Sequence, residues 1–194
     1  GAPDDAWRVD FAANRALLEA AYGLELRKFI LLSAICVQRP LLEFQRAKLA
    51  FEKLLHESGI DYSIVRPTAF FKSLAGQVNR VKAGKPFLIF GDGRLTACKP
   101  ISDRDMARYI TGCLSDPGRR NRILPIGGPG PAITPREQGE LLCRLAGRPL
   151  RVRSVSPRLF DLALSMLGPL SRVVPSLEAK AELGVRTTTN NAAA

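Results

Sequence analysis

Two apolar runs with one amphipathic helix between them constrain the fold of this chain more than any other feature. The run RKFILLSAICV at residues 27–37 is too continuously apolar for a half-exposed strand, which favours a buried, parallel strand. The run IDYSIVRPTAFF at residues 60–71 predicts a second strand, whose regular part should end before Pro67 because proline cannot donate to a ladder. Strands that alternate with helices predict an α/β fold with a mostly parallel sheet.

The helix between these strands carries a lysine in its apolar face. At about 100° per residue, the apolar side chains fall within one arc, and Lys48 lies near the centre of that arc. A buried ammonium group is costly unless it is paired or bound to something. Lys48 therefore either extends past its neighbours to water or faces a site. The arc consists of Phe44, Ala47, Phe51, Leu54 and Leu55.

The ends of the two strands predict where such a site lies. Ligands of open parallel sheets bind beyond the carboxyl ends of the strands, and these ends fall at Ser33-Ala34 and Pro67-Thr68. One crevice is therefore expected to collect Ser33, Lys48 and Thr68. From the residues alone, Ser33 is equally well explained as a small residue that ends a strand, and Pro67-Thr68 as a simple turn into a loop.

Cap residues and apolar periodicity predict the remaining elements. Ser102 and Asp105 have the spacing of a helix start, and Thr134 and Glu137 form a capping box with a proline at the first helical position. The apolar stretch 157–177 indicates either a packing helix or a surface for a hydrophobic ligand or membrane. The expected helices span 9–23, 72–86, 101–116 and 133–147, and the expected strands span 87–93 and 122–128.

The chain is strongly basic, with a formal net charge of +11. This balance suits nucleic acid, an anionic membrane surface or an anionic ligand. The basic residues are scattered and do not interleave with aromatic residues, which argues against a nucleic-acid partner. With four widely spaced cysteines and a single histidine, His56, we expect free thiols and no metal site.

The order of these motifs resembles the short-chain dehydrogenase/reductase superfamily. A strand that ends in Ser33, a helix with Phe44 four residues before Lys48, and a strand that ends in Arg-Pro-Thr at residues 66–68 match its pattern. In ordinary members the aromatic residue is a tyrosine that donates a proton, and the lysine holds the nicotinamide ribose. Phe44 has no proton to give, so the chain resembles the atypical branch, which includes isoflavone-reductase-like enzymes and NmrA-like sensors.

Longer segments narrow the resemblance. Over about residues 5–180, they are similar to the NADPH-dependent divinyl chlorophyllide 8-vinyl reductases of (bacterio)chlorophyll biosynthesis. That family implies NADPH as cofactor and reduction of an 8-vinyl group to ethyl. The segments are SAICVQRPLLEFQRAKLAFE, IVRPTAFFKSLAGQV, GKPFLIFGDGRLTACKPIS and RILPIGGPGPAITPREQGELL.

The chain departs from that family at both ends. Members begin with a strand and a GxxGxxG turn that holds the pyrophosphate, and the sequence has no such motif ahead of its first helix. The resemblance therefore implies the C-terminal part of a Rossmann-like NAD(P)-binding fold with a small substrate-binding α/β portion. We expect the dinucleotide-binding half at residues 1–72, the substrate-binding portion with returning Rossmann elements at 73–180, and a disordered or altered tail at 181–194.

The resemblance assigns roles at the cofactor. Lys48 is expected to hydrogen-bond the nicotinamide ribose or to relay a proton to the substrate carbon, which makes it the catalytic candidate. Ser33 is expected beside the nicotinamide. Pro67, Thr68 and Phe70 are expected to bracket the nicotinamide from its other side.

The candidates for the tetrapyrrole substrate, a divinyl chlorophyllide, are Phe71, Lys72 and Arg66. An aromatic ring stacks on a macrocycle face, and a cation meets its anionic propionate. Aromatic residues after a strand are nevertheless more typical of a core. Depending on the source, we expect the cytoplasm of a photosynthetic bacterium or a chloroplast, with peripheral association with the photosynthetic membrane as an option.

Two other classes of protein stay open. A non-catalytic NAD(P)-sensing or scaffold protein of the NmrA-like kind would bind nucleotide without turnover. An inactive fragment would neither bind nor catalyse, and a long apolar sheet edge would make it prone to aggregate.

Overall fold

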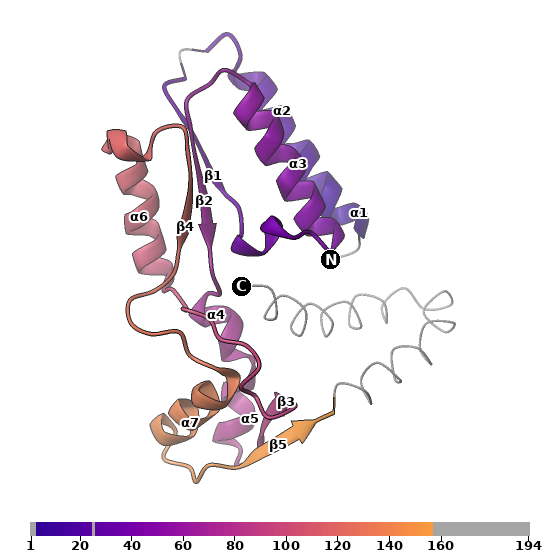
Figure 1. The fold of residues 1–194 in the computed structure, drawn as a ribbon, viewed down its shortest axis with the longest axis vertical. Helices are drawn as coiled ribbons and strands as arrows, with labels where there is room; N and C mark the ends of the chain where they lie inside the picture. The colour runs from indigo at the N-terminus through magenta and orange to yellow at the C-terminus, as the bar shows by residue number, and fades with distance from the viewer. Residues whose placement is uncertain (1–2, 25, 157–194) are drawn as a thin grey trace, which may run out of the picture. The chain divides into compact units, whose positions relative to one another are not determined.

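The computed structural model describes residues 3–24 and 26–156 (Figure 1). The chain divides into two compact units. Within the described residues, no helix is both long and apolar enough to cross a bilayer. The first unit comprises Gly1–Phe70 and Pro100–Gly128, and the second comprises Phe71–Lys99 and Pro129–Ala194.

The expected assignment of residues 1–72, 73–180 and 181–194 to a dinucleotide-binding half, a substrate-binding portion and a tail stays a prediction. The chain first passes from one unit to the other after Phe70, close to the expected boundary. The apolar stretch 157–177 and the expected tail lie outside the described residues.

A three-stranded parallel sheet in the order β1-β2-β4 forms the first unit's framework. Its strands are β1 (Phe29–Leu32), β2 (Tyr62–Pro67) and β4 (Arg122–Ile126). The central strand β2 is buried along its whole length, because it pairs on both sides and is covered on both faces. The predicted α/β fold with a parallel sheet is confirmed.

The first strand is shorter than the apolar run that predicted it. β1 ends at Leu32, and the residues after it form a 3₁₀ helix, η2 (Ile35–Gln38). Val37 of this 3₁₀ helix is completely buried. The run over 27–37 is continuously apolar because a strand and a 3₁₀ helix both contribute buried side chains, and periodicity cannot separate the two.

The second strand extends one residue further than predicted. β2 includes Pro67, which pairs with Ile126 of β4. Backbone N–H groups along a strand point alternately to its two sides, and Thr68 N donates to Ile126 O at 2.9 Å. The missing N–H of Pro67 therefore faces the β1 side, where β1 has already ended, so the proline costs no hydrogen bond.

Two helical segments cover one face of this sheet (Figure 1). The first is a continuous run of α1 (Pro3–Ala6), the π-helix η1 (Trp7–Ala13) and α2 (Asn14–Ala21), and the second is α3 (Glu43–Glu57). Burying a side chain of the size of Phe51 contributes roughly 2–3 kcal/mol. The core between these helices and the sheet contains Leu18, Leu31, Phe51, Leu55, Tyr62 and Ile64.

Helix α3 begins and ends where its sequence provides signals. The side-chain carbonyl of Gln45 accepts hydrogen bonds from Leu41 N at 2.7 Å and Leu42 N at 2.9 Å, which satisfies two donors at the helix start. The helix ends at Glu57, and Gly59 follows with a φ of 75°, a conformation that favours glycine.

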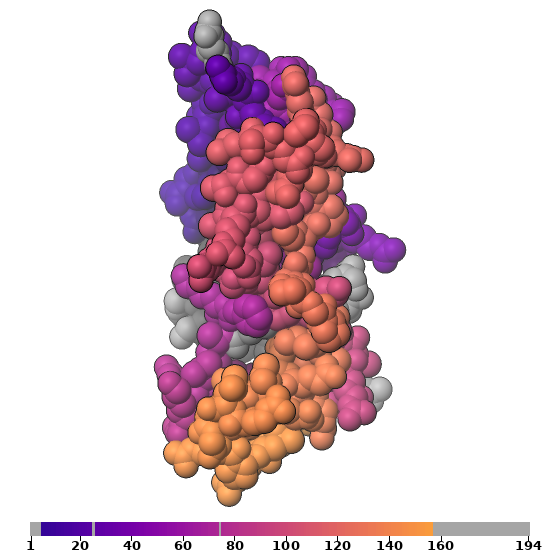
Figure 2. Space-filling model, turned by 90° about the vertical axis from the view of Figure 1, so that its left-hand side faces the viewer, coloured from indigo at the N-terminus to yellow at the C-terminus, as the bar shows by residue number. Residues whose placement is uncertain are grey.

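Helix α6 (Asp103–Ser115) covers the other face of the sheet, and Figure 2 views its outer surface. Its predicted cap is confirmed, because Ser102 Oγ accepts from Asp105 N at 3.0 Å. A short 3₁₀ helix, η4 (Pro117–Arg119), then leads into β4. The core under α6 contains Val65, Ile101, Met106 and Cys113.

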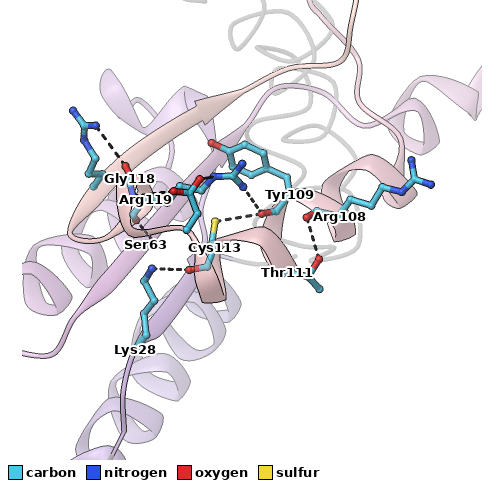
Figure 3. Close-up of polar contacts among 10 residues, drawn as sticks. Lys28, Ser63, Arg108, Tyr109, Thr111, Cys113, Gly118 and Arg119 are labelled. Carbon is cyan, nitrogen blue, oxygen red and sulfur yellow. Dashed lines mark hydrogen bonds and ion pairs between the residues drawn. The ribbon is translucent and has the colours of Figure 1, made fainter.

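Side chains at the amino-terminal end of the strands pin the end of α6 (Figure 3). Lys28 Nζ donates to Cys113 O at 2.6 Å, and a guanidinium N–H of Arg119 donates to Tyr109 O at 2.9 Å. Ser63 Oγ donates to Arg119 O at 2.5 Å. Cations near a helix carboxyl terminus are favourable. In this region, called the amino end below, the polar side chains therefore bond to backbone carbonyls of the protein itself.

The second unit pairs β3 (Phe87–Phe90) with β5 (Val152–Val155) in parallel and packs α7 (Pro135–Leu145) against them. The capping box of Thr134 and Glu137 is confirmed. The sequence pattern does not reveal β5, because Arg153 and Ser154 separate its two valines and the stretch does not stand out as apolar.

The helix predicted over 72–86 is interrupted. It consists of α4 (Phe71–Leu74), the 3₁₀ helix η3 (Ala75–Gln77) and α5 (Val78–Lys82). The Gln77 side chain at the interruption accepts from Leu88 N at 2.6 Å and donates to Leu88 O at 2.8 Å. This amide acts as a partner for strand β3, a role that periodicity alone does not reveal.

Candidate functional site

The carboxyl ends of the parallel strands bring the predicted site residues of the first unit to one edge. Ser33 directly follows β1, and its N–H donates to Val65 O at 2.8 Å. Thr68 directly follows β2 in the same way. The connection after β1 returns the chain so that α3 begins at this edge, with Lys48 in its second turn (Figure 1). This edge is called the carboxyl end below.

Ser33 has a buried hydroxyl group without a partner. Its side chain is 5% exposed, and Oγ makes no hydrogen bond within the described residues. Leaving a buried polar group unpaired costs about 1–3 kcal/mol. Such a group at the carboxyl end of a parallel sheet is suited to hydrogen-bond a ligand.

Lys48 neither extends freely into water nor lies unpaired in the apolar face. Its Nζ lies 2.9 Å from Asp10 Oδ1, and the two side chains are 23% and 24% exposed. Ala47, Phe51 and Leu55 of the predicted apolar arc are fully buried, so the helix face is confirmed. The lysine lies at the margin of that face and is compensated by a carboxylate.

Asp10 is the site residue that the sequence analysis missed. It lies 38 positions before Lys48, in a segment expected to be an ordinary α-helix. The structure instead places it in the π-helix η1, where the Asn14 side-chain amide donates to Val9 O at 3.2 Å and Asp10 O at 3.1 Å. The local sequence carries no signal for this contact, because the two residues are far apart in the chain.

A second contact joins the π-helix to the start of α3. Trp7 Nε1 donates to Glu43 Oε2 at 2.9 Å, and Arg46 also pairs with Glu43. The hydrogen bond from Trp7 is the main cause that lowers the pKa of the Glu43 carboxyl, with Arg46 as the second cause. This end of α3 is therefore tied to η1 at two positions that are five residues apart.

The other cofactor candidates lie at the same edge with different surroundings. Pro67 is buried in β2, and Thr68 is half-buried after it. Phe70 packs against the core under α6 and forms a bridge with Ile101. The contact of these three candidates with a nicotinamide stays a prediction.

Arg66 is engaged inside the protein. Its Nε donates to Glu52 Oε1 at 3.1 Å, and a second guanidinium N–H bonds the other oxygen of the same carboxylate. Arg66 is 9% exposed and Glu52 3%, and both line a pocket of about 520 Å³ beside α3. A substrate role for Arg66 stays a prediction, with two of its donors already used by Glu52.

Phe71 and Lys72 begin α4 in the second unit. Both are exposed, Phe71 with 52% of its surface accessible. An exposed aromatic ring followed by a cation is compatible with a ligand that has an apolar face and an anionic tail. Their role in substrate binding stays a prediction.

Comparison with known proteins adds a second line of information. A family model described as NAD(P)H-binding matches residues 1–117. The chain is 56% identical to a divinyl chlorophyllide a 8-vinyl-reductase, chloroplastic, of Oryza sativa subsp. indica, over 95% of the chain and 47% of the rice protein. It is 48% identical to the protein of the same name from Arabidopsis thaliana, over 95% of the chain and 46% of that protein. The chain thus spans about half the length of these relatives.

A solved structure supports the fold. An NADPH-dependent quinone oxidoreductase from Escherichia coli, complexed with NADPH, superposes with a TM-score of 0.65 at 18% identity. The match covers 79% of this chain and 54% of that protein. The likeness confirms the predicted Rossmann-like fold.

Proposed function

This chain belongs to the NAD(P)H-binding family, and from that membership we propose that it serves the NADPH-dependent reduction of the 8-vinyl group of divinyl chlorophyllide to ethyl in (bacterio)chlorophyll biosynthesis. The observation that carries the proposal is the 56% identity with the rice 8-vinyl-reductase over 95% of the chain.

NADPH suits the residues at the carboxyl end. The buried, unpaired hydroxyl of Ser33 offers a hydrogen bond that the protein itself does not satisfy. Lys48 has three N–H donors, of which Asp10 occupies one, and the others can reach ribose hydroxyls. In this proposal Pro67, Thr68 and Phe70 form the wall on the other side of the nicotinamide. The positive net charge also favours an anionic cofactor.

The reaction adds one hydride and one proton across the vinyl double bond. Bound NADPH supplies the hydride. Phe44 cannot provide the proton, because its side chain has no ionisable group. We assign the proton to the ammonium group of Lys48, the cation that the fold holds at the carboxyl end.

The substrate is proposed to use the first turn of α4. The exposed ring of Phe71 would stack on the macrocycle, and Lys72 would meet the propionate. Arg66 is the weaker candidate for that carboxylate because Glu52 already holds it. A pigment substrate suits a chloroplast, or the cytoplasm of a photosynthetic bacterium, with peripheral contact with the photosynthetic membrane.

The test uses the full open reading frame that encodes this chain. The purified protein is mixed with NADPH and divinyl chlorophyllide, and pigment chromatography follows the 8-ethyl product. We expect product from the wild type and loss of product in Lys48→Ala. The matched control is Lys53→Ala, an exposed lysine on the same helix, which should keep wild-type turnover.

A wild-type protein that binds NADPH without forming product would contradict the enzymatic proposal. That outcome would favour the non-catalytic NAD(P)-sensing or scaffold class. Failure to bind NADPH as well would favour the inactive fragment.

A further inference from the structure

The ion pair between Asp10 and Lys48 joins two helical segments that are distant in sequence. Asp10 is the one partner of Lys48 Nζ within residues 3–24 and 26–156, and the contact of 2.9 Å is a charge-assisted hydrogen bond. Both side chains remain about one quarter exposed. A pair that is only partly buried gains less than a fully buried one loses when broken, and the contact also fixes where the ammonium group lies.

The π-helix sets the direction of the Asp10 side chain. A π-helix closes i to i+5 hydrogen bonds and is rare, and short π segments within α-helices occur frequently at functional sites. The extra residue in each turn rotates the following side chains relative to an uninterrupted α-helix. The Asn14 side-chain amide stabilises this π-helical geometry, because it donates to the backbone carbonyls of Val9 and Asp10.

A second contact fixes the spacing between the two segments. Trp7 Nε1 donates to Glu43 at the first position of α3, five residues before Lys48. Trp7 is itself packed edge-to-face on Phe11, with ring centroids 5.6 Å apart. With both contacts in place, neither segment can slide without breaking a charge-assisted hydrogen bond.

We infer that Asp10 is a positioning residue for the reaction: its carboxylate holds the Lys48 ammonium in place at the carboxyl end, with two N–H donors left for cofactor and substrate. This inference rests on the proposed function of Lys48. Asp10 acts through Lys48 and touches neither the cofactor nor the reacting carbon.

The experiment is a double-mutant cycle in the full open reading frame. Asp10→Asn keeps the shape of the side chain and removes its charge, and Lys48→Ala removes the partner. NADPH affinity is measured by titration calorimetry and turnover by product formation. We expect Asp10→Asn to weaken binding or turnover roughly tenfold in the wild-type background, because small misplacement of a reacting group is costly. In the Lys48→Ala background, where product formation is lost, the same change should alter NADPH affinity by less than about twofold, because the coupling partner is absent.

Two further variants separate positioning from folding. Asp10→Glu retains the charge and should recover most of the lost affinity and turnover. Glu19→Gln removes an acid from the exposed Arg15 pair on α2 and should leave both unchanged. Unfolding midpoints of all variants should agree within a few degrees, which keeps a fold defect distinguishable from a positioning defect.

Equal losses from Asp10→Asn in both backgrounds would overturn the inference, since Asp10 would then act independently of Lys48. Wild-type behaviour of Asp10→Asn would overturn it as well. If the wild type binds NADPH but forms no product, the reductase proposal fails, and coupling in NADPH affinity still decides the role of Asp10. A wild type that does not bind NADPH overturns both.

Discussion

The two ends of the parallel sheet in the first unit differ in whether their polar side chains have hydrogen-bond partners. At the amino end, Lys28, Ser63 and Arg119 each take part in a hydrogen bond to a backbone carbonyl (Figure 3). At the carboxyl end, the Ser33 hydroxyl is buried and has no partner in the described part of the chain. The Lys48 ammonium there keeps donors to spare.

Within this one sheet, the amino end contributes to stability and the carboxyl end is suited to binding. The contacts at the amino end hold α6 and the starts of the strands together. The carboxyl end leaves polar capacity unused, as a site in an open parallel sheet requires.

Glu52→Gln is expected to give the largest loss of stability. It leaves the buried Arg66 without its counter-charge beside α3, the helix that carries Lys48 to the carboxyl end. Removing one partner of a buried pair costs about 3–5 kcal/mol. Urea unfolding measures the change, and Lys53→Gln, which breaks an exposed pair on the same helix, should cost under about 0.5 kcal/mol. A cost for Glu52→Gln as small as that of the control would show that α3 does not depend on this pair.

Ser63→Ala should destabilise the amino end without affecting the cofactor. The change removes the donor to Arg119 O from a fully buried position. Leaving that carbonyl unpaired should cost about 1–2 kcal/mol of unfolding free energy. NADPH affinity by calorimetry should match the wild type, and a weakened affinity would break the contrast between the two ends.

Ser33→Ala is the matched change at the carboxyl end, with the opposite outcome. Because Ser33 Oγ is buried without a partner in the described residues, its removal should raise the unfolding free energy by about 1 kcal/mol or more. NADPH affinity should fall several-fold, about 1 kcal/mol, since the loss is that of one hydrogen bond. Equal affinity in wild type and variant would remove Ser33 from the site.

The smallest expected effect is on the stability of the protein at low pH. The pKa of Glu43 is lowered in the folded state, first by the hydrogen bond from Trp7 and then by Arg46. A depressed carboxyl pKa contributes stability above its unfolded value, and this is lost as the pH falls through the folded pKa. Unfolding midpoints of the wild type and Glu43→Gln should therefore begin to converge as the pH falls below about 4.3, the pKa of an unperturbed glutamate, and should coincide once the pH is below the lowered folded pKa. A difference that persists at lower pH would mean that the charge of Glu43 is not its source.

Local sequence patterns predicted the strands and helices of the molecule, but they could not predict contacts between residues that are far apart in the sequence. Strand ends placed Ser33 and Thr68 at one edge, because parallel strands share a direction. The helix arc placed Lys48 at a candidate site, but nothing in the local sequence showed that Asp10, in a π-helix, would meet it. Arg66 illustrates the same limit. Its position in the sequence suggested a contact with the substrate, whereas in the fold its guanidinium group binds the Glu52 carboxylate.

The boundaries that failed have a common cause. The apolar run after β1 mixes a strand with a 3₁₀ helix, and β5 has too few apolar residues to stand out. In both cases the side-chain pattern reports burial and does not report backbone geometry. Capping residues such as Ser102 and Thr134 predicted boundaries well, because their hydrogen bonds are local.

The position of Trp7 has a practical consequence. It is the single tryptophan of this sequence, and its indole lies on the π-helix that also carries Asp10. Indole emission overlaps the absorption of a reduced nicotinamide, so this chain contains an energy-transfer donor next to its candidate cofactor site. Quenching of one native chromophore would report arrival of the reduced cofactor, and recovery of the emission would report its oxidation, without any label attached to the protein.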